Sequence, residues 1–270
     1  MDYSVLMSVY FKETGCNLKD ALNSMKNQTI PPHEIVLVCD GDLTEELEEV
    51  ISEFQISNSG LLRLIRREKS NNWAEVLNVG LKECQCSLVA RMDSDDISLP
   101  QRCEKQLLEF RKHPEIDLVG TALGEFENSE NNVVRKRLLP SAHDEIVRFA
   151  KYRSPVNHAT AMFKKKSVLD AGGYQYFPSF EDYYLWMRML KHGCKFENLS
   201  DMLYLMRADG VYNRRGNIKY FCTTMKFKTW MYKEGFNTLF EFVWSGLGYG
   251  IITLIPSKLR EKFYTVFLRR

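Results

Sequence analysis

The sequence predicts an α/β fold with a mostly parallel sheet that helices cover on both faces. In the first hundred residues, short apolar runs of strand length alternate with segments of helical spacing. The run at residues 35–38 is continuously apolar, which is typical of a strand buried on both faces. Two such runs end at an aspartate, Asp40 and Asp93. Because parallel strands bind ligands at their carboxyl ends, we expect both acids on one rim of the sheet.

Apolar spacing and turn residues assign the elements in order along the chain. Pro31-Pro32 should end the first helix, and Thr44 should cap the second. The helix at 181–192 is apolar nearly all round, so we expect it to be buried. The expected strands are 4–10, 34–39, 61–65, 87–92, 116–126, 133–138 and 160–163, and the expected helices are 17–28, 44–54, 73–84, 100–113, 144–152 and 181–192.

Charge is distributed unevenly over the 270 residues, which suffice for one large domain or a domain with an appendage. Residues 207–270 hold 12 Lys/Arg against 4 Asp/Glu, a net charge of +8. Residues 1–206 hold 25 against 31, a net charge of −6, so the total of +2 hides an acidic body and a basic tail. Such a tail can face anionic lipid, nucleic acid or a phosphorylated substrate.

The tail also contains an uncharged run at residues 242–256, FVWSGLGYGIITLIP. It is shorter than the roughly 20 apolar residues that cross a bilayer, and it contains three glycines. Basic residues follow it, which favours a helical segment lying on an anionic membrane surface. A core helix that packs on the rest of the protein is the alternative.

The seven cysteines and the first residues indicate a cytoplasmic protein. The cysteine number is odd and no Cys-x-x-Cys pair occurs, so we expect free thiols in a reducing compartment. Lys12 and Glu13 interrupt the first apolar run, which excludes a secretory leader at this position. With the basic tail, this predicts a protein held peripherally on the inner face of the cytoplasmic membrane.

Two acidic motifs are candidates for chemistry. Asp93, Asp95 and Asp96 place three mutually repelling carboxylates at a strand end, where a divalent cation and a bound diphosphate would offset their charge. A solvated acidic turn is the alternative for this motif. Glu181-Asp182 begins an aromatic-rich helix, where it either caps the helix or supplies a general base.

The motifs together resemble glycosyltransferase family 2, whose fold is called GT-A. The resemblance covers about residues 4–207 and keeps the family's order of motifs. It implies a GT-A domain over 1–207, with a nucleotide-binding half at 1–98 and an acceptor-binding half at 99–207, and a helical extension over 208–270. The segments that carry it are SVLMSVY, VLVCDGD, NNWAEVLNVGL, ARMDSDDISLPQRCEKQLLEF, NHATAMFKKKSVLDAGGY and FEDYYLWMRMLKHG.

For the donor side, the resemblance implies that Asp40 contacts the uracil or ribose. Asp93 and Asp95 would form the metal–diphosphate site for Mn²⁺ or Mg²⁺, with Asp95 the direct ligand. Asp96 would support that site or touch the donor sugar. Asn78 would contact substrate from the family's Asn-x-Gly element. Trp73 departs from the family, because many relatives carry a glycine in this loop.

For the acceptor side, the resemblance implies that Asp182 is the general base and that Glu181 orients it or the acceptor. Three further positions stay open between a site role and a structural one. His158 would lie near the acceptor or be a hydrogen-bonded structural histidine, Trp186 would stack on a sugar or belong to the core, and Arg91 would serve the donor or the fold. Arg207 matches a basic position that can contact the diphosphate.

The resemblance implies an inverting, metal-dependent transferase that uses a UDP-sugar, either UDP-glucose or UDP-galactose. The acceptor would be a polyprenyl-diphosphate-linked sugar in O-antigen or capsule synthesis, and the product would be β-linked. The alternatives are a nucleotidyltransferase, for which the loop at residues 10–13 lacks the expected Gly-rich segment, a glycosidase, and a silent membrane- or glycan-binding protein. The tail has no nucleic-acid-reading motif, so no nucleic acid partner is expected.

Overall fold

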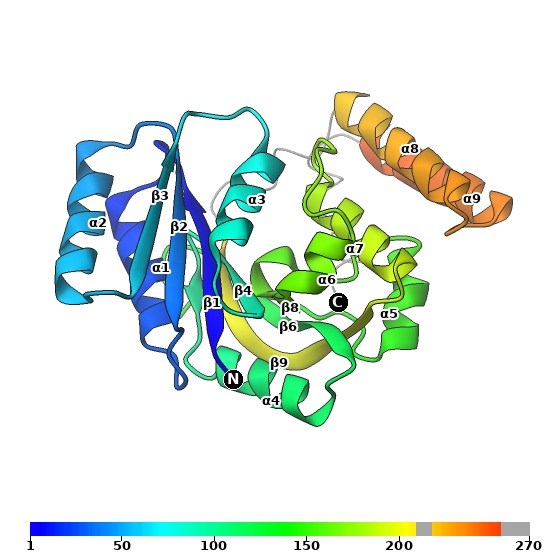
Figure 1. The fold of residues 1–270 in the computed structure, drawn as a ribbon. Helices are drawn as coiled ribbons and strands as arrows, with labels where there is room; N and C mark the ends of the chain where they lie inside the picture. Colours follow the sequence, from blue (N-terminus) through cyan, green and yellow to red (C-terminus); the bar gives the residue numbers. More distant parts are fainter. Residues whose placement is uncertain (209–217, 255–270) are drawn as a thin grey trace.

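A computed structural model of the chain describes residues 1–208 and 218–254. One nine-stranded sheet runs through it, in the order β3-β2-β1-β4-β8-β6-β9-β5, with β7 paired to β6. Strands β1 to β4 are parallel, and β8 is antiparallel to β4 and β6. Helices cover both faces of the sheet, α1 and α2 on one side and α3 on the other (Figure 1). The predicted α/β class with a mostly parallel sheet is confirmed.

The elements match most of the expected ones within a few residues. The strands are β1 Tyr3–Val9, β2 Glu34–Asp40, β3 Leu62–Arg67, β4 Leu88–Asp93, β5 Ile97–Ser98, β6 Ile116–Phe126, β7 Val133–Arg137, β8 Met162–Lys164 and β9 Lys195–Arg207. The helices are α1 Gly15–Lys26, α2 Glu45–Ser57, α3 Trp73–Glu83, α4 Arg102–Lys112, α5 His143–Ala150, α6 Lys165–Asp170, α7 Glu181–Lys191, α8 Ile218–Lys233 and α9 Leu239–Leu254, with a 3-10 turn η1 at His158–Thr160.

The helix starts show why these segments fold as they do. Thr44 caps α2 as expected, because its hydroxyl accepts the backbone N–H of Leu47 at 3.4 Å. Thr14 caps α1 in the same way, and the side chain of Asn72 accepts the N–H of Ala74 at 3.1 Å at the start of α3. These caps fix where each helix begins, next to the carboxyl end of the strand before it.

Two core clusters sandwich the central strands. Val5 and Met7 of β1 pack under α1, α2 and α4, whereas Leu6 faces the opposite way, toward α3 and α7. This alternation follows from the two-residue period of a strand. Because both clusters are fully buried, the carboxyl ends of β1, β2 and β4 are held in fixed register at one edge.

Strand β9 and the short elements β5 and α6 were not predicted. The first half of β9 is polar, its exposure alternates only as far as Leu199, and its pairing with β6 contains three register shifts. Irregular strands of this kind give no period-2 signal in a sequence. The consequence matters, because β9 ends at Arg207 beside the acidic motif.

The C-terminal helices α8 and α9 lie next to each other at one end of the molecule, beside α7 (Figure 1). Phe227 and Met231 of α8 form a third cluster with Phe180, Tyr183 and Met187 at the start of α7. Among the described residues, no helix is long and apolar enough to cross a membrane. The apolar run expected at 242–256 lies partly in α9, and residues 255–270 fall outside the described residues.

Candidate functional site

The carboxyl ends of β1, β2 and β4 surround a cavity of about 460 Å³ that we call the first cavity. The start of α3 closes one side of it, so the strand–helix register described above builds its walls. Three predicted acids line it together, which confirms the geometric expectation of one shared rim. The lining residues are Ser8, Val9, Tyr10, Glu13, Asp40, Ser70, Asn71, Trp73, Val76, Arg91, Asp93, Ser94 and Asp95.

Asp40 lies at the end of β2 and is fixed by the loop that follows β3. Its Oδ1 accepts the backbone N–H of Ser70 at 2.9 Å, and the Arg67 guanidinium lies 3.8 Å away. One oxygen is thus used for orientation while the residue still lines the cavity. This arrangement suits a carboxylate that accepts hydroxyl or N–H hydrogen bonds from a ligand.

Arg91 is 1 % exposed and contacts the acidic segment, which we define as residues 93–96. It donates to the backbone oxygens of Leu6 and Met92, and its guanidinium forms an ion pair with Asp93 Oδ1 at 2.5 Å. The same group lies 5.4 Å from the ring centre of Trp73, a cation–π contact. Arg91 therefore has the structural role that the sequence left open, and it also lines the cavity, while its contact with a donor stays a prediction.

The acidic segment carries uncompensated negative charge. The pKa of the Asp95 carboxyl is raised to about 6, first by burial and then by the charges of Asp93 and Glu13. Burial, followed by the charges of Asp93 and Asp95, also raises the pKa of Asp96 well above its usual value. A cation placed here would relieve this repulsion.

Asp96 and Arg207 lie behind the first cavity and are not among its lining residues. Asp96 is 2 % exposed, and its Oδ1 accepts the backbone N–H of Arg207 at 2.8 Å. Arg207 Nε donates to the backbone oxygen of Asp95 at 3.1 Å, and its guanidinium packs over Phe126. The structure therefore favours the supporting role for Asp96 and places Arg207 as a clamp on the acidic segment.

Asn78 occupies a different place from the one expected for a substrate contact. It is absent from the lining of the first cavity. Its amide donates to the backbone oxygen of Tyr174 at 2.7 Å and accepts the N–H of Tyr174 at 2.9 Å. This pair of bonds joins α3 to the loop that leads into α7. Gly173 has φ +64° there, and a Cβ on it would lie 2.8 Å from Asn78 Oδ1.

The same loop is also held from α7. Arg188, which is nearly buried, donates to the backbone oxygens of Ala171 and Gly173. Asn78 and Arg188 thus bind the backbone of three residues within 171–174 from two helices. The start of α7, which carries Glu181 and Asp182, is connected in this way to α3, which borders the first cavity.

His158 and Trp186 belong to an aromatic group behind the first cavity. His158 Nε2 lies 2.9 Å from the Tyr174 hydroxyl, and its ring contacts Trp73 and Trp186. Burial, and then the charge of Arg91, lower the pKa of His158 well below its usual value, so the ring is neutral. Trp186 is fully buried in the core, so of its two expected roles the structure favours the core one over stacking on a sugar, because neither ring face is accessible.

Glu181 and Asp182 begin α7 and are both half-buried. Burial raises the pKa of Glu181, and backbone hydrogen bonds at the start of the helix oppose this, as expected for a capping carboxylate. Burial also raises the pKa of Tyr174, where Arg91 acts in opposition and Asp182 and Asp93 add to the rise. Asp182 is therefore close enough to the Tyr174 phenol to affect its pKa, as Arg91 and Asp93 also do.

Among the lining residues of the first cavity that were not predicted as site residues, three have large or charged side chains. Tyr10 and Glu13 follow β1, and Trp73 opens α3. Glu13 Oε2 accepts the Ser94 hydroxyl at 3.0 Å, so it contacts the acidic segment. The sequence could have indicated these residues by their position just after a strand or at the start of the next helix, because such loops form the ligand edge of an α/β sheet.

The acidic segment fits a divalent cation that shares its coordination with a ligand. No three Asp, Glu, His or Cys side chains within residues 1–208 and 218–254 form a complete metal cage. Mg²⁺ and Mn²⁺ are commonly held by one or two carboxylates together with substrate phosphates. Asp95 and Asp93 supply oxygen donors of that kind, with Asp93 Oδ1 also bonded to Arg91.

Comparison with solved structures supports the fold. The chain superposes on Staphylococcus aureus TarS 1-349 in complex with UDP-GlcNAc with a TM-score of 0.69 and 16 % identity, covering 100 % of this chain and 76 % of that one. It superposes on the mannosyltransferase PcManGT from Pyrobaculum calidifontis, in complex with GDP-Man and Mn²⁺, with a TM-score of 0.66 and 14 % identity, covering 97 % and 72 %.

Relatives in sequence cover most of the chain. An uncharacterized glycosyltransferase of Haemophilus influenzae is 35 % identical over 100 % of both chains, and the amylovoran biosynthesis glycosyltransferase AmsE of Erwinia amylovora is 41 % identical over 79 % of this chain and 80 % of its own. The Escherichia coli UDP-Gal:alpha-D-GlcNAc-diphosphoundecaprenol beta-1,3-galactosyltransferase is 31 % identical over 99 % and 97 %. The model of glycosyl transferase family 2 matches residues 4–173, and with these relatives it shows that the chain belongs to that family of transferase enzymes.

Proposed function

We propose that the protein transfers a hexose from a UDP-sugar to a polyprenyl-diphosphate-linked sugar, with inversion, in O-antigen or capsule repeat-unit synthesis. The observation that carries this proposal is the first cavity, where Asp40 and the Asp93–Asp95 segment line one space. A relative named as using UDP-Gal and an undecaprenol-linked GlcNAc supports the donor and acceptor classes, and one named for amylovoran synthesis supports the polysaccharide context.

Each residue has a distinct part in the proposed donor complex. Asp40 would accept hydrogen bonds from the uridine, and Asp95 with Asp93 would hold Mn²⁺ or Mg²⁺. When bound, the metal offsets the charge that develops on the departing diphosphate. Arg91 keeps Asp93 in place, and the hydrogen bonds from the Arg207 N–H to Asp96 and from Arg207 Nε to the backbone oxygen of Asp95 fix the shape of the acidic segment.

Asp182 is the proposed general base. The acceptor hydroxyl oxygen forms a bond to the anomeric carbon while the bond from that carbon to the UDP oxygen breaks. The hydroxyl proton passes to the Asp182 carboxylate. A single displacement inverts the centre, so an α-linked donor gives a β-linked product. Glu181, at the same helix start, would orient the acceptor.

Association with a membrane surface is proposed for α9. Leu239, Phe240, Val243 and Trp244 are 48–75 % exposed along its first turns, and Phe240 and Trp244 stack on each other. Large aromatic and aliphatic side chains on the outside of a helix suit the boundary between lipid headgroups and acyl chains. We place the protein on the inner face of the cytoplasmic membrane, where UDP-sugars and a lipid-linked acceptor would meet.

A transfer assay tests the proposal. Purified protein is incubated with single UDP- and GDP-sugars, with Mn²⁺ or EDTA, and with GlcNAc- or GalNAc-diphosphate-lipid. We expect metal-dependent transfer from one UDP-hexose, and a β-linkage by NMR of the product. Asp182→Asn should retain UDP binding and lose about 10²–10⁴-fold in turnover. Transfer that persists in EDTA, or an α-linked product from an α-linked donor, would overturn the mechanism.

A further inference from the structure

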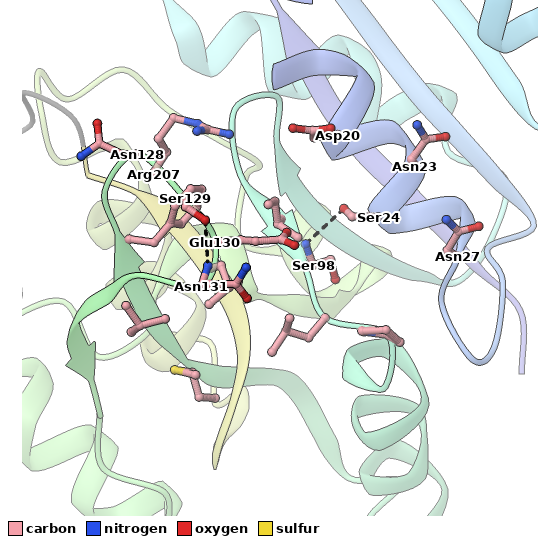
Figure 2. Close-up of a pocket in the computed structure, with 17 residues that line it drawn as sticks. Asp20, Asn23, Ser24, Asn27, Ser98, Asn128, Ser129, Glu130, Asn131 and Arg207 are labelled. Atoms are coloured by element: carbon pink, nitrogen blue, oxygen red, sulfur yellow. Dashed lines mark hydrogen bonds between the residues drawn. The ribbon is translucent and has the colours of Figure 1, made fainter. Parts of the chain in front are cut away.

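A second and larger cavity, of about 800 Å³, lies on the other side of the acidic segment. We call it the second cavity. Figure 2 shows α1 on one side, the turn between β6 and β7 on the other, and Ser98 between them. Its lining residues are Asp20, Asn23, Ser24, Asn27, Ile97, Ser98, Leu99, Pro100, Phe126, Asn128, Ser129, Glu130, Asn131, Val133, Met202, Leu205 and Arg207.

Amide side chains dominate the rim of the second cavity. Asn23 and Asn27 follow Asp20 at positions i+3 and i+7 of α1, so the three form one stripe. Asn131 lies across from this stripe on the β6–β7 turn (Figure 2), and Asn128 of the same turn also lines the cavity. Within the described residues, none of these four asparagine side chains forms a hydrogen bond with another residue. Each amide therefore offers an acceptor and two donors to a ligand.

The floor of the cavity is apolar. Ile97, Leu99, Met202 and Leu205 lie between the two polar walls and are buried or half-buried. The floor is rigid at its edge, because the Ser98 N–H donates to the Ser24 hydroxyl at 3.1 Å, and Gln28 donates to the backbone oxygen of Leu99. A polar rim over an apolar floor matches a pyranose, which presents hydroxyls at its edge and C–H groups on its faces.

The charges argue for a neutral ligand. Among the described residues that line the cavity, two are acids, Asp20 and Glu130, and one is a base, Arg207. Arg207 is already bonded to the backbone oxygen of Asp95 and packed on Phe126. None of these described lining residues is a lysine. A phosphate or another anion would meet a net negative rim, so the proposal excludes the diphosphate and the nucleotide from this cavity.

We propose that the second cavity is a subsite for a neutral oligosaccharide, namely sugars of the glycan that do not react. The subsite rests on the proposed function for its biological context, but its binding chemistry does not depend on catalysis. Its place fits such a role, because residues 93–95 line the first cavity and residues 97–100 line the second. Residues 93–100 therefore lie between the proposed site of transfer and the proposed subsite.

Saturation-transfer NMR and calorimetry with neutral tetrasaccharides of hexoses and N-acetylhexosamines test the subsite. We expect at least one to bind with millimolar or better affinity. The Asn23→Ala/Asn27→Ala double variant should weaken it by about tenfold or more, since each hydrogen bond is worth roughly two- to tenfold. Lys19→Ala, on the same helix but outside the cavity, is the matched control and should leave binding unchanged.

Asn128→Gly is a second variant from the opposite wall. Asn128 has φ +61°, a conformation that glycine adopts without strain, so the change removes the amide and keeps the turn. It should also weaken binding, by roughly two- to tenfold. Absence of binding for every tetrasaccharide, unchanged affinity in both variants, or tighter binding of a phosphorylated tetrasaccharide would overturn the subsite.

Transfer assays on the same preparations separate the two proposals. With a monosaccharide-diphosphate-lipid acceptor, the double variant should keep the wild-type kcat and KM. Oligosaccharide binding without any sugar transfer would contradict the proposed function alone. Sugar transfer without oligosaccharide binding would contradict the subsite alone.

Discussion

The two cavities lie on either side of residues 93–100 and differ in the charge of their walls. The first contains Asp93 and Asp95, and burial with mutual repulsion raises the pKa of Asp95. The second is walled mainly by uncharged amides over an apolar floor. A cation would offset the negative charge of the first cavity, whereas the proposed ligand of the second is a neutral polyhydroxy compound that requires no cation.

The largest expected effect is a loss of sugar transfer when metal binding in the first cavity is weakened. Asp95→Asn removes a ligand charge and should lower transfer by about 10³-fold, because metal stabilisation of the leaving group is worth several kcal/mol. Mn²⁺ binding, followed by electron paramagnetic resonance, should weaken in parallel. Oligosaccharide binding in the second cavity should not change. Loss of both together would mean that the cavities act as one site.

The next effect concerns the hydrogen bonds between α3 and the loop that leads into α7, which lie outside the first cavity. Asn78→Ala removes both bonds to the backbone of Tyr174 and should displace the start of α7. We expect kcat to fall by about 10- to 100-fold, as misplaced catalytic groups do, while UDP-sugar KM stays near wild type. Tyr174→Phe keeps these backbone bonds and loses only the contact with His158, so it is the milder control. A rise in KM with unchanged kcat would instead support a direct substrate contact by Asn78.

A smaller effect concerns Trp73, the aromatic wall of the first cavity. It is 40 % exposed and lies against the Arg91 guanidinium. Trp73→Ala should raise donor KM by about three- to tenfold, since an exposed cation–π contact and the ring's contact area are worth roughly 1 kcal/mol. Trp73→Phe should restore most of the affinity. Initial-rate kinetics over a range of UDP-sugar concentrations measure both, and an unchanged KM in Trp73→Ala would remove this residue from the donor site.

The smallest expected effect is a pH dependence of folding stability that Asp95 of the first cavity causes. Because the folded pKa of Asp95 is about 6, the metal-free protein holds a proton there that the unfolded chain releases near pH 4. This group's contribution to stability is present at low pH and is lost as the pH rises through 6. Mn²⁺ should therefore raise Tm by a few degrees more at pH 7.5 than at pH 5.5. Scanning calorimetry checks this, and an equal shift at both values would contradict it.

Sequence reasoning located the acids of the first cavity but not the residues that position them. Asp40, Asp93 and Asp95 follow apolar runs, so a strand-and-rim argument was enough to bring them together. Arg207 lies on β9, which was not predicted because its alternation of exposure breaks down after Leu199 and its register shifts. Trp186 stayed open between two roles because a buried and a sugar-stacking tryptophan look alike in a sequence.

The sequence by itself determined the strand–helix order of the first hundred residues, the cap of α2, and the acidic edge of the sheet, because these depend on residues that are neighbours along the chain. Only the tertiary structure decided that Asn78 meets Tyr174, 96 positions later, and that α1 faces the β6–β7 turn across the second cavity. Such pairings depend on how the sheet curls and how β6 and β9 slip in register. No local pattern of side chains encodes that geometry.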